Sequence, residues 1–260
     1  MIRAVGRERI AVWLLAVLLI ATSLGVVYVG TPYTATPAEI RAVEDDPGVA
    51  VSALDGGYVL EPTEASAVED ASMGLVFYPG ARVDPSAYLE TLAPVVDRTG
   101  ATVYIPRPAL NLAVFDARIA DPIIDANPKT TSWYVGGHSL GGAMACRFAD
   151  RNADRLDGLV LFGSYCDRDL AGSGLRVLSV QGSADTVIDR ETAEANREFL
   201  PNRAVEITID GMNHTQFGSY RGQPGDSPAT ISYEQAHEEL GDVLVAFLRG
   251  ENASAAVSDS

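Results

Sequence analysis

The fold of this chain is decided by the stretch Trp133-Tyr134-Val135-Gly136-Gly137-His138-Ser139-Leu140-Gly141-Gly142-Ala143. The apolar residues at its start predict a strand, and the small residues at its end predict a helix that packs close to a sheet. Between them lies the pattern G-x-S-x-G, in which glycines stand two residues before and after Ser139. Such glycines leave no side chains to clash across a tight strand-to-helix turn. The stretch therefore predicts an exposed Ser139 on a strained turn, suited to nucleophilic attack.

Strand-like and helix-like segments alternate on both sides of this turn. Short apolar runs predict a hairpin over 49–60 and strands over 74–78, 101–105, 132–136, 159–162, 176–180 and 205–209. Apolar residues at helical spacing predict helices over 85–98, 116–126, 139–153, 190–200 and 233–248. This alternation is typical of an α/β fold with a mostly parallel central sheet flanked by helices. Only about a dozen residues separate Phe162 from Arg176, so no large cap domain fits there.

A serine hydroxyl is a weak nucleophile and needs a base within hydrogen-bond reach, which is most often a histidine. The chain has three histidines. His138 adjoins Ser139 and is expected to point away from the turn, and His237 lies in the middle of a predicted helix. His214 follows the last predicted strand in a loop that can reach over the sheet edge. Position and elimination both favour His214 as the general base.

The base needs a carboxylate that accepts a hydrogen bond from its other ring nitrogen. Asp185 lies just past the predicted strand over 176–180, at the carboxyl edge of the same sheet. Asp167 follows the preceding strand and remains the alternative acid. The sequence favours Asp185.

An oxyanion formed during acyl transfer needs backbone N–H donors, usually from the residue after the serine and from a loop after an earlier strand. Leu140 is the first of these residues. Gly80 permits an unusual backbone turn after the strand over 74–78, so Ala81 is expected to supply the second N–H. Gly80 and Arg82 remain alternatives for that role.

The chain order Ser139, Asp185, His214 resembles that of the α/β-hydrolase superfamily, over roughly residues 50–250. Within it, the segments 78–85, 111–115 and 213–218 are similar to a small uncapped bacterial and archaeal subgroup related to the dienelactone hydrolases, of the α/β-hydrolase fold-5 type. The resemblance implies the α/β-hydrolase fold and an esterase-like activity. Dienelactone hydrolases proper use a cysteine nucleophile, whereas the serine in this chain favours ordinary carboxylic esters.

These residues predict a serine hydrolase that cleaves small-molecule carboxylic esters through an acyl-enzyme at Ser139. The prediction involves no metal ion and no organic cofactor. Two alternatives stay open at this point. The first is a membrane-anchored domain that binds a ligand without catalysis, and the second is a peptidase or an acyltransferase that uses the same three residues.

The first thirty residues differ from the rest of the chain. Arg3, Arg7 and Arg9 precede an uncharged stretch over 10–29, long enough to cross a hydrocarbon core of about 30 Å. The sequence therefore predicts a cytoplasmic N-terminus over 1–9, a transmembrane signal anchor over 10–29, and a catalytic domain facing outward from the cell membrane. With a cleaved signal peptide instead, the protein would be secreted. The remaining ranges are a linker over 30–47, the catalytic domain over 48–250 and a disordered tail over 251–260.

The charge of the chain is strongly negative, with 35 acidic against 19 basic residues and a formal net charge of −16. Such a field repels phosphate groups and argues against nucleic acid partners. Lys129 is the only lysine. An acidic surface almost without lysine suits a protein that works at high salt, and a GC-rich genome is the alternative reason for this composition.

Two cysteines, Cys146 and Cys166, lie in the predicted catalytic domain. An outward location would allow them to form a disulfide. The alternative is a pair of small buried side chains, and two cysteines without nearby histidines are too few for a zinc site.

Overall fold

The computed structural model describes residues 6–66 and 72–256, without the side chains of residues 7, 8, 21, 24, 26, 27 and 29. Contacts divide the chain into two units, residues 1–32 and residues 33–260.

The N-terminal unit contains one helix, α1 (Arg7–Gly30), whose described apolar side chains, such as Trp13 and Leu14, are exposed. A helix that spans a bilayer needs about 20 consecutive apolar residues. Among the described residues, no helix combines the length and the apolar character that a membrane crossing requires. The predictions of a transmembrane signal anchor over 10–29 and of a single-pass membrane location are therefore wrong.

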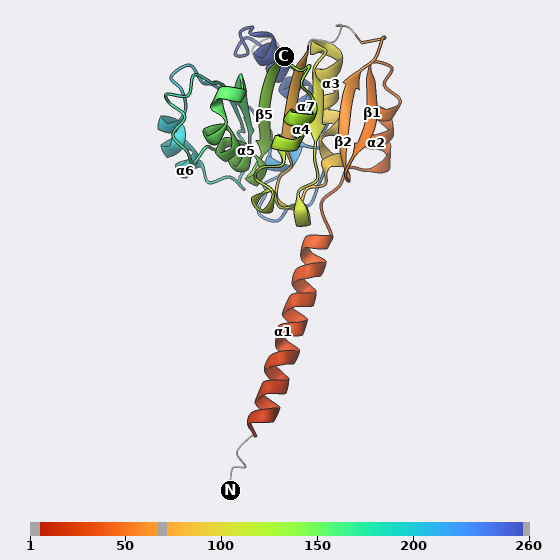
Figure 1. Ribbon diagram of the computed structural model, residues 1–260, viewed down its shortest axis with the longest axis vertical. Coiled ribbons are helices and arrows are strands. Elements are labelled where there is room, and N and C mark those ends of the chain that lie inside the picture. Colours follow the sequence, from red (N-terminus) through yellow and green to blue (C-terminus); the bar gives the residue numbers. More distant parts are fainter. Residues whose placement is uncertain (1–5, 67–71, 257–260) are drawn as a thin grey trace. The chain divides into compact units, whose positions relative to one another are not determined.

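The second unit is built on one eight-stranded sheet in the order β1-β2-β4-β3-β5-β6-β7-β8 (Figure 1). Its strands are β1 (Val49–Leu54), β2 (Gly57–Pro62), β3 (Met73–Tyr78), β4 (Thr102–Ile105), β5 (Ser132–His138), β6 (Gly158–Phe162), β7 (Arg176–Gly182) and β8 (Val205–Ile209). The β1–β2 and β2–β4 pairs are antiparallel, and all the other pairs are parallel. Because the strands from β3 onwards run in one direction, their carboxyl ends lie at one edge, where the candidate site forms.

Helices cover both faces of this sheet. They are α2 (Pro37–Glu44), α3 (Leu89–Thr99), α4 (Ala120–Ala126), α5 (Leu140–Arg151), α6 (Arg190–Ala195) and α7 (Tyr233–Arg249). Alternate residues of β3 enter two separate cores: Leu75 and Phe77 pack with residues of α3 and α7, whereas Val76 and Tyr78 pack with residues of α4 and α5. The mostly parallel sheet between helices agrees with the predicted fold class.

The segments on either side of the sheet are more ordered than the sequence indicated. In the predicted linker, Thr36 starts α2 with a capping box in which its hydroxyl accepts the N–H of Glu39, and Val43 on α2 is buried. In the predicted tail, Ala253 is buried against the core, and residues 257–260 lie outside the described part of the chain.

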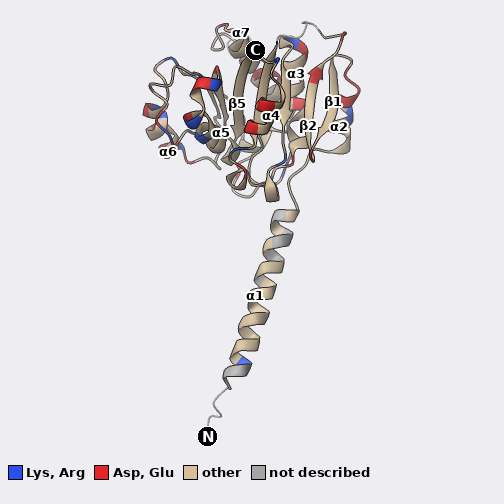
Figure 2. Cartoon of the chain, viewed as in Figure 1, with Lys and Arg blue, Asp and Glu red and all other residues tan. Residues whose placement is uncertain are grey.

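The acidic residues are distributed over most elements of the second unit, as Figure 2 shows. The excess of negative charge is therefore a property of the whole domain and does not come from one segment. Its connection with high salt stays a prediction.

A disulfide joins Cys146 on α5 to Cys166 in the loop after β6, with their Cα atoms 5.4 Å apart. The predicted pairing is confirmed. Because α5 begins directly after Ser139, the bond ties the helix behind the predicted nucleophile to a loop at the carboxyl edge of the sheet.

Replacing both cysteines, Cys146→Ala with Cys166→Ala, is expected to lower the free energy of unfolding by about 3 kcal/mol, because the bond closes a loop of about 20 residues in the unfolded chain. Urea unfolding of the two proteins measures this difference. Dithiothreitol should lower the stability of the wild-type protein and leave the double variant unchanged. An equal effect of the reductant on both proteins would contradict the disulfide.

Candidate active site

Ser139 occupies the sharp turn between β5 and α5. Its φ of 54° and ψ of −124° lie in a region that residues with side chains rarely adopt. Gly137 must lack a side chain, because a Cβ there would come within 2.6 Å of the Gly141 backbone. The turn is fixed on both sides: the Ser139 N–H donates to Phe162 O at 2.9 Å, and the Ser164 hydroxyl donates to Ser139 O at 2.7 Å.

His214 and Asp185 form a buried hydrogen-bonded pair, with 2.7 Å between His214 Nδ1 and Asp185 Oδ2. The other carboxylate oxygen of Asp185 accepts the N–H groups of Val187 and Ile188, at 2.8 and 3.1 Å. A carboxylate only accepts hydrogen bonds, so Nδ1 of His214 carries the proton and Nε2 keeps its lone pair. The imidazole is thus held in the form that can take a proton through Nε2.

Nε2 of His214 is buried and makes no hydrogen bond to any residue that the structure describes, Ser139 included. Hydrogen bonds between nucleophile and base are often long in ligand-free enzymes and shorten when substrate is bound. A ring contact shows that the imidazole of His214 lies next to the turn of Ser139: the ring centroids of His138 and His214 are 4.4 Å apart. His214 therefore lies against the residue that precedes Ser139.

The loop that carries His214 is fixed by Asp226, a residue that the sequence analysis missed. The Asp226 carboxylate accepts the backbone N–H groups of His214 and Thr215, at 3.1 and 2.9 Å. These N–H groups begin the short helix η6 (His214–Phe217) and would otherwise lack partners. Asp226 is separated from His214 by a loop without regular periodicity, so no local pattern pointed to it.

Asp167, the alternative acid, is engaged elsewhere. Its carboxylate accepts hydrogen bonds from Nε of Arg147 at 3.0 and 3.1 Å, and no hydrogen bond from Asp167 to His214 is found among the described residues. The Arg147 guanidinium also lowers the pKa of the Asp167 carboxyl group. Of the two acids, the structure brings only Asp185 to the histidine.

The segment after β3, residues 79–83, lies against the turn between β5 and α5. It contains the predicted oxyanion donor and is called the oxyanion loop below. A Cβ on Gly141 would collide with the carbonyl oxygens of Tyr78 and Pro79, so the backbone of this segment touches the first turn of α5. The first N–H groups of a helix have no partner within it, and the N–H of Leu140 is one of these.

Two of the three candidate donors in the oxyanion loop are already used. The N–H of Gly80 donates to the Tyr88 hydroxyl at 2.9 Å, and the N–H of Arg82 donates to Asn111 O at 2.8 Å. The N–H of Ala81 has no hydrogen-bond partner among residues 6–66 and 72–256. Leu140 and Ala81 are thus the residues whose N–H groups are available to a negatively charged oxygen.

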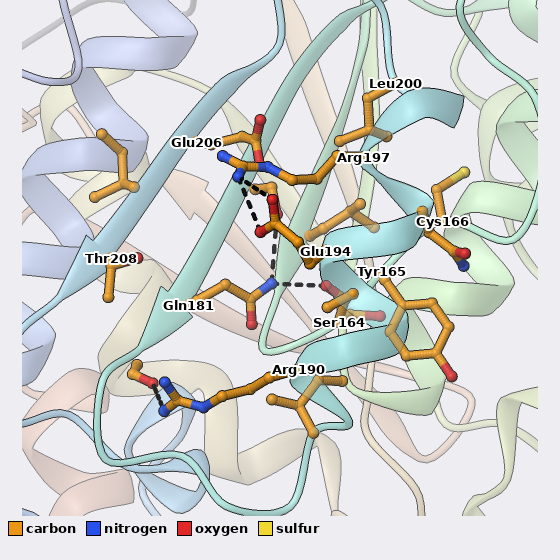
Figure 3. Close-up of a pocket in the computed structure, with 17 residues that line it drawn as sticks. Ser164, Tyr165, Cys166, Gln181, Arg190, Glu194, Arg197, Leu200, Glu206 and Thr208 are labelled. Atoms are coloured by element: carbon orange, nitrogen blue, oxygen red, sulfur yellow. Dashed lines mark hydrogen bonds and ion pairs between the residues drawn. The ribbon is translucent and has the colours of Figure 1, made fainter.

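A cavity of about 230 Å³ lies between α6 and the strands β7 and β8 (Figure 3). Ser139, Asp185 and His214 do not line it, and charged side chains that pair with one another do: Arg197 contacts both Glu194 and Glu206. Because none of the predicted catalytic residues faces it, we do not assign substrate binding to this cavity.

Two residues that line this cavity form hydrogen bonds with the loops of the candidate site. Arg190 donates to the carbonyl oxygens of Gly182 and Asp185, both at 3.0 Å, and so holds the turn that carries the acid. Gln181 donates from Nε2 to Ser164 O at 2.8 Å, and Ser164 in turn holds the carbonyl of the nucleophile turn. Among the described residues, no group of three or more His, Cys, Asp or Glu side chains is placed to hold a metal ion.

Comparisons with known proteins bear on the family and the fold. Residues 74–238 match the sequence model of the alpha/beta hydrolase family. No curated protein matches the chain in sequence.

Many solved structures share the fold. They include a CIB-like hydrolase from Thermoplasma acidophilum, with 17% identity over 78% of this chain and 100% of that one and a TM-score of 0.56. A dienelactone hydrolase from Anabaena variabilis has 17% identity over 78% and 99% of the two chains and a TM-score of 0.53. Carboxyl esterase 2 from Tuber melanosporum has 14% identity over 82% and 88%, with a TM-score of 0.52. At these identities the likeness shows the fold alone.

Replacement of the acid tests the choice between the two aspartates. Asp185→Asn is expected to lower kcat for p-nitrophenyl acetate by about 10⁴-fold, because an amide no longer holds the imidazole in the tautomer that accepts a proton. Asp167→Asn is the matched control, since it removes the same charge from a residue paired with Arg147, and it should leave kcat within about twofold of the wild type. A large loss in the control and not in Asp185→Asn would assign the acid to Asp167.

Proposed function

Since this chain belongs to the alpha/beta hydrolase family, we propose that it is a serine hydrolase that cleaves carboxylic esters of small molecules. The observation that carries this proposal is the buried His214–Asp185 hydrogen bond of 2.7 Å beside the strained turn of Ser139. A carboxylate that orients an imidazole next to a half-buried serine on a strained turn is the arrangement that activates a hydroxyl for attack on a carbonyl carbon. A hydrogen-bonded carboxylate–imidazole pair beside a serine favours catalysis over ligand binding alone.

The proposed reaction has two halves. In the first, the Ser139 hydroxyl attacks the ester carbonyl carbon while Nε2 of His214 takes its proton. The negatively charged oxygen of the tetrahedral intermediate accepts hydrogen bonds from the N–H groups of Leu140 and Ala81. The intermediate then collapses, the C–O bond to the alcohol breaks, and the imidazolium gives its proton to the departing alcohol. An acyl-enzyme at Ser139 is left.

In the second half, water takes the place of the alcohol. His214 removes a proton from the water molecule, the resulting hydroxide adds to the acyl carbon, and the same N–H groups hold the new oxyanion. Collapse releases the carboxylic acid and returns the proton to the Ser139 oxygen. Asp185 stays ionised throughout and stabilises the imidazolium in both halves.

We propose that an exposed apolar loop contacts the acyl group of the substrate. Leu110, Val114 and Phe115 are exposed, with 61%, 47% and 60% of their surfaces accessible. Their loop is anchored to the candidate site, because Asn111 O accepts the N–H of Arg82 and the neighbouring residue Ala113 is buried in the core that includes α5. Large apolar side chains exposed beside a reaction centre favour esters with an apolar acyl group.

A peptidase and an acyltransferase use the same residues and differ in the leaving group or in the acceptor of the acyl group. Assays with a peptide substrate and with an added alcohol distinguish both from an esterase. Turnover of peptides would favour the first, and transfer of the acyl group to an added alcohol at the expense of hydrolysis would favour the second.

Loss of the nucleophile tests the proposal. The wild-type protein is expected to hydrolyse p-nitrophenyl acetate and butyrate and to be labelled by a fluorophosphonate probe at Ser139. In Ser139→Ala, hydrolysis should fall by about 10⁶-fold, because the covalent step is lost. Labelling should disappear as well, and mass spectrometry of the labelled peptide identifies the site. Absence of both activities in the folded wild-type protein would favour the binding domain.

Polar substitution of the exposed apolar loop tests the acyl preference. Leu110→Ser combined with Phe115→Ser should raise KM for p-nitrophenyl octanoate about tenfold more than KM for the acetate, because only the longer chain contacts these side chains. Initial rates over a series of acyl lengths measure the ratio. An equal change for both esters would show that the loop does not contact the acyl chain.

A further inference from the structure

Two buried side chains are in contact beside the turn of Ser139, and neither takes part in the reaction described above. Tyr88 and His138 are both fully buried. The Tyr88 hydroxyl lies 2.9 Å from Nδ1 of His138, and the same oxygen accepts the N–H of Gly80 at 2.9 Å. A chain of two hydrogen bonds therefore joins the oxyanion loop to the residue that precedes Ser139.

The direction of each hydrogen bond follows from its donor. A backbone N–H can only donate, so the Tyr88 oxygen accepts from Gly80. Among the described residues, the only group placed to accept the proton of the Tyr88 hydroxyl is Nδ1 of His138, so Nδ1 is the acceptor. His138 is therefore the neutral tautomer with its proton on Nε2, and Nε2 has no partner among the described residues.

Both groups are held neutral by their surroundings. Burial lowers the pKa of His138 well below its usual value, and the nearby His214 lowers it further. Burial likewise raises the pKa of the Tyr88 hydroxyl far above its usual value. A protonated His138 would lose the lone pair that Tyr88 uses, and it would also face the imidazolium of His214 during the reaction.

The peptide unit that carries the Ala81 N–H is fixed by this chain of hydrogen bonds. Gly80 is held at both ends, because its N–H donates to Tyr88 and its carbonyl accepts the N–H of Val83 at 3.1 Å. A trans peptide directs its N–H opposite to its carbonyl, and the described residues contain no cis peptide. With the carbonyl of Gly80 turned towards Val83, the N–H of Ala81 points the other way and remains without a partner.

Tyr88 also contacts the loop that carries the base. A Cβ on Gly218 would come within 3.2 Å of the Tyr88 ring, and a Cβ on Gly80 would come within 2.9 Å of His138 Nδ1. The ring of His138 in turn packs against the ring of His214, with centroids 4.4 Å apart. The pair thus touches the oxyanion loop, the nucleophile turn and the base loop, and no side chain fits at the two contacting glycines.

We propose that Tyr88 and His138 are positioning residues that hold the oxyanion loop with the Ala81 N–H directed at the reaction centre. They act through Gly80 and touch neither the substrate nor the reacting atoms. The proposal rests on the function proposed above, because it assigns the pair a role in stabilising the oxyanion of the same reaction.

Removal of one oxygen atom is the direct test. Tyr88→Phe leaves the ring in place and breaks both hydrogen bonds, so kcat for p-nitrophenyl butyrate should fall about 10- to 100-fold while KM changes less than about twofold. The matched control is Tyr134→Phe, which removes the hydroxyl of another buried tyrosine whose partner is Arg176, and it should leave kcat unchanged.

The acceptor at residue 138 is tested by a pair of variants. His138→Asn keeps an oxygen acceptor at the position of Nδ1 and should retain at least about a third of wild-type kcat. His138→Leu offers no acceptor and should lose as much activity as Tyr88→Phe. If Tyr88→Phe fails to fold, this pair decides the question, since only the acceptor distinguishes the two variants.

A reversible inhibitor separates positioning from general damage. A trifluoromethyl ketone forms an oxyanion on the serine, so its Ki should rise in Tyr88→Phe by the same factor by which kcat/KM falls. Unchanged kcat and Ki in Tyr88→Phe, or equal kcat in the two His138 variants, would overturn the positioning role while the wild-type enzyme stays active. A wild-type protein without turnover or labelling of Ser139 would instead overturn the proposed function, and with it this inference.

Discussion

The structure depends on one constraint at the end of β5: the backbone of Ser139 must take a left-handed conformation between a strand and a helix. That conformation costs of order 1–3 kcal/mol for a residue with a side chain. It persists because the neighbouring backbone is packed tightly around it: Gly137 lies against Gly141, and the carbonyl oxygens of Tyr78 and Pro79 also lie against Gly141. Every other part of the candidate site is arranged around this turn.

Three loops reach the turn from different strands, and each is fixed by a different kind of partner. The loop of Asp185 after β7 is held through backbone carbonyls by Arg190, and the loop of His214 after β8 is held through backbone N–H groups by Asp226. The oxyanion loop after β3 is held by the neutral Tyr88 hydroxyl. Buried polar groups are costly when they lack partners. Most of the buried polar groups in these loops have hydrogen-bond partners, so the loops are held in one conformation without a ligand.

Much of this arrangement could be predicted from local patterns. The strand-turn-helix around Ser139 and the alternation of strands and helices predicted the mostly parallel sheet, because periodicity and glycine spacing are local properties. Asp185 and His214 could be placed at one sheet edge because residues that follow parallel strands meet there. Their roles stay predictions until activity is measured. The membrane anchor was inferred from composition alone and is not supported by any described helix.

The residues that escaped prediction are those whose partners are far away in the sequence. Tyr88 contacts His138, which lies 50 positions further along the chain, and Asp226 contacts the backbone of His214 across an irregular loop. His138 was expected to point away from the turn of Ser139. It is buried between Tyr88 and His214, and this position depends on how three separate loops pack. No periodicity or short motif encodes such contacts.

The loop with Leu110, Val114 and Phe115 differs from the other loops at this edge of the sheet. It is attached by backbone hydrogen bonds and by Ala113, and its large side chains contribute little to the core. Those side chains can therefore be exchanged with little effect on folding or on the nucleophile turn. Under the proposed function, substitutions in this loop would therefore change the preference for the acyl group while the turn of Ser139 stays intact.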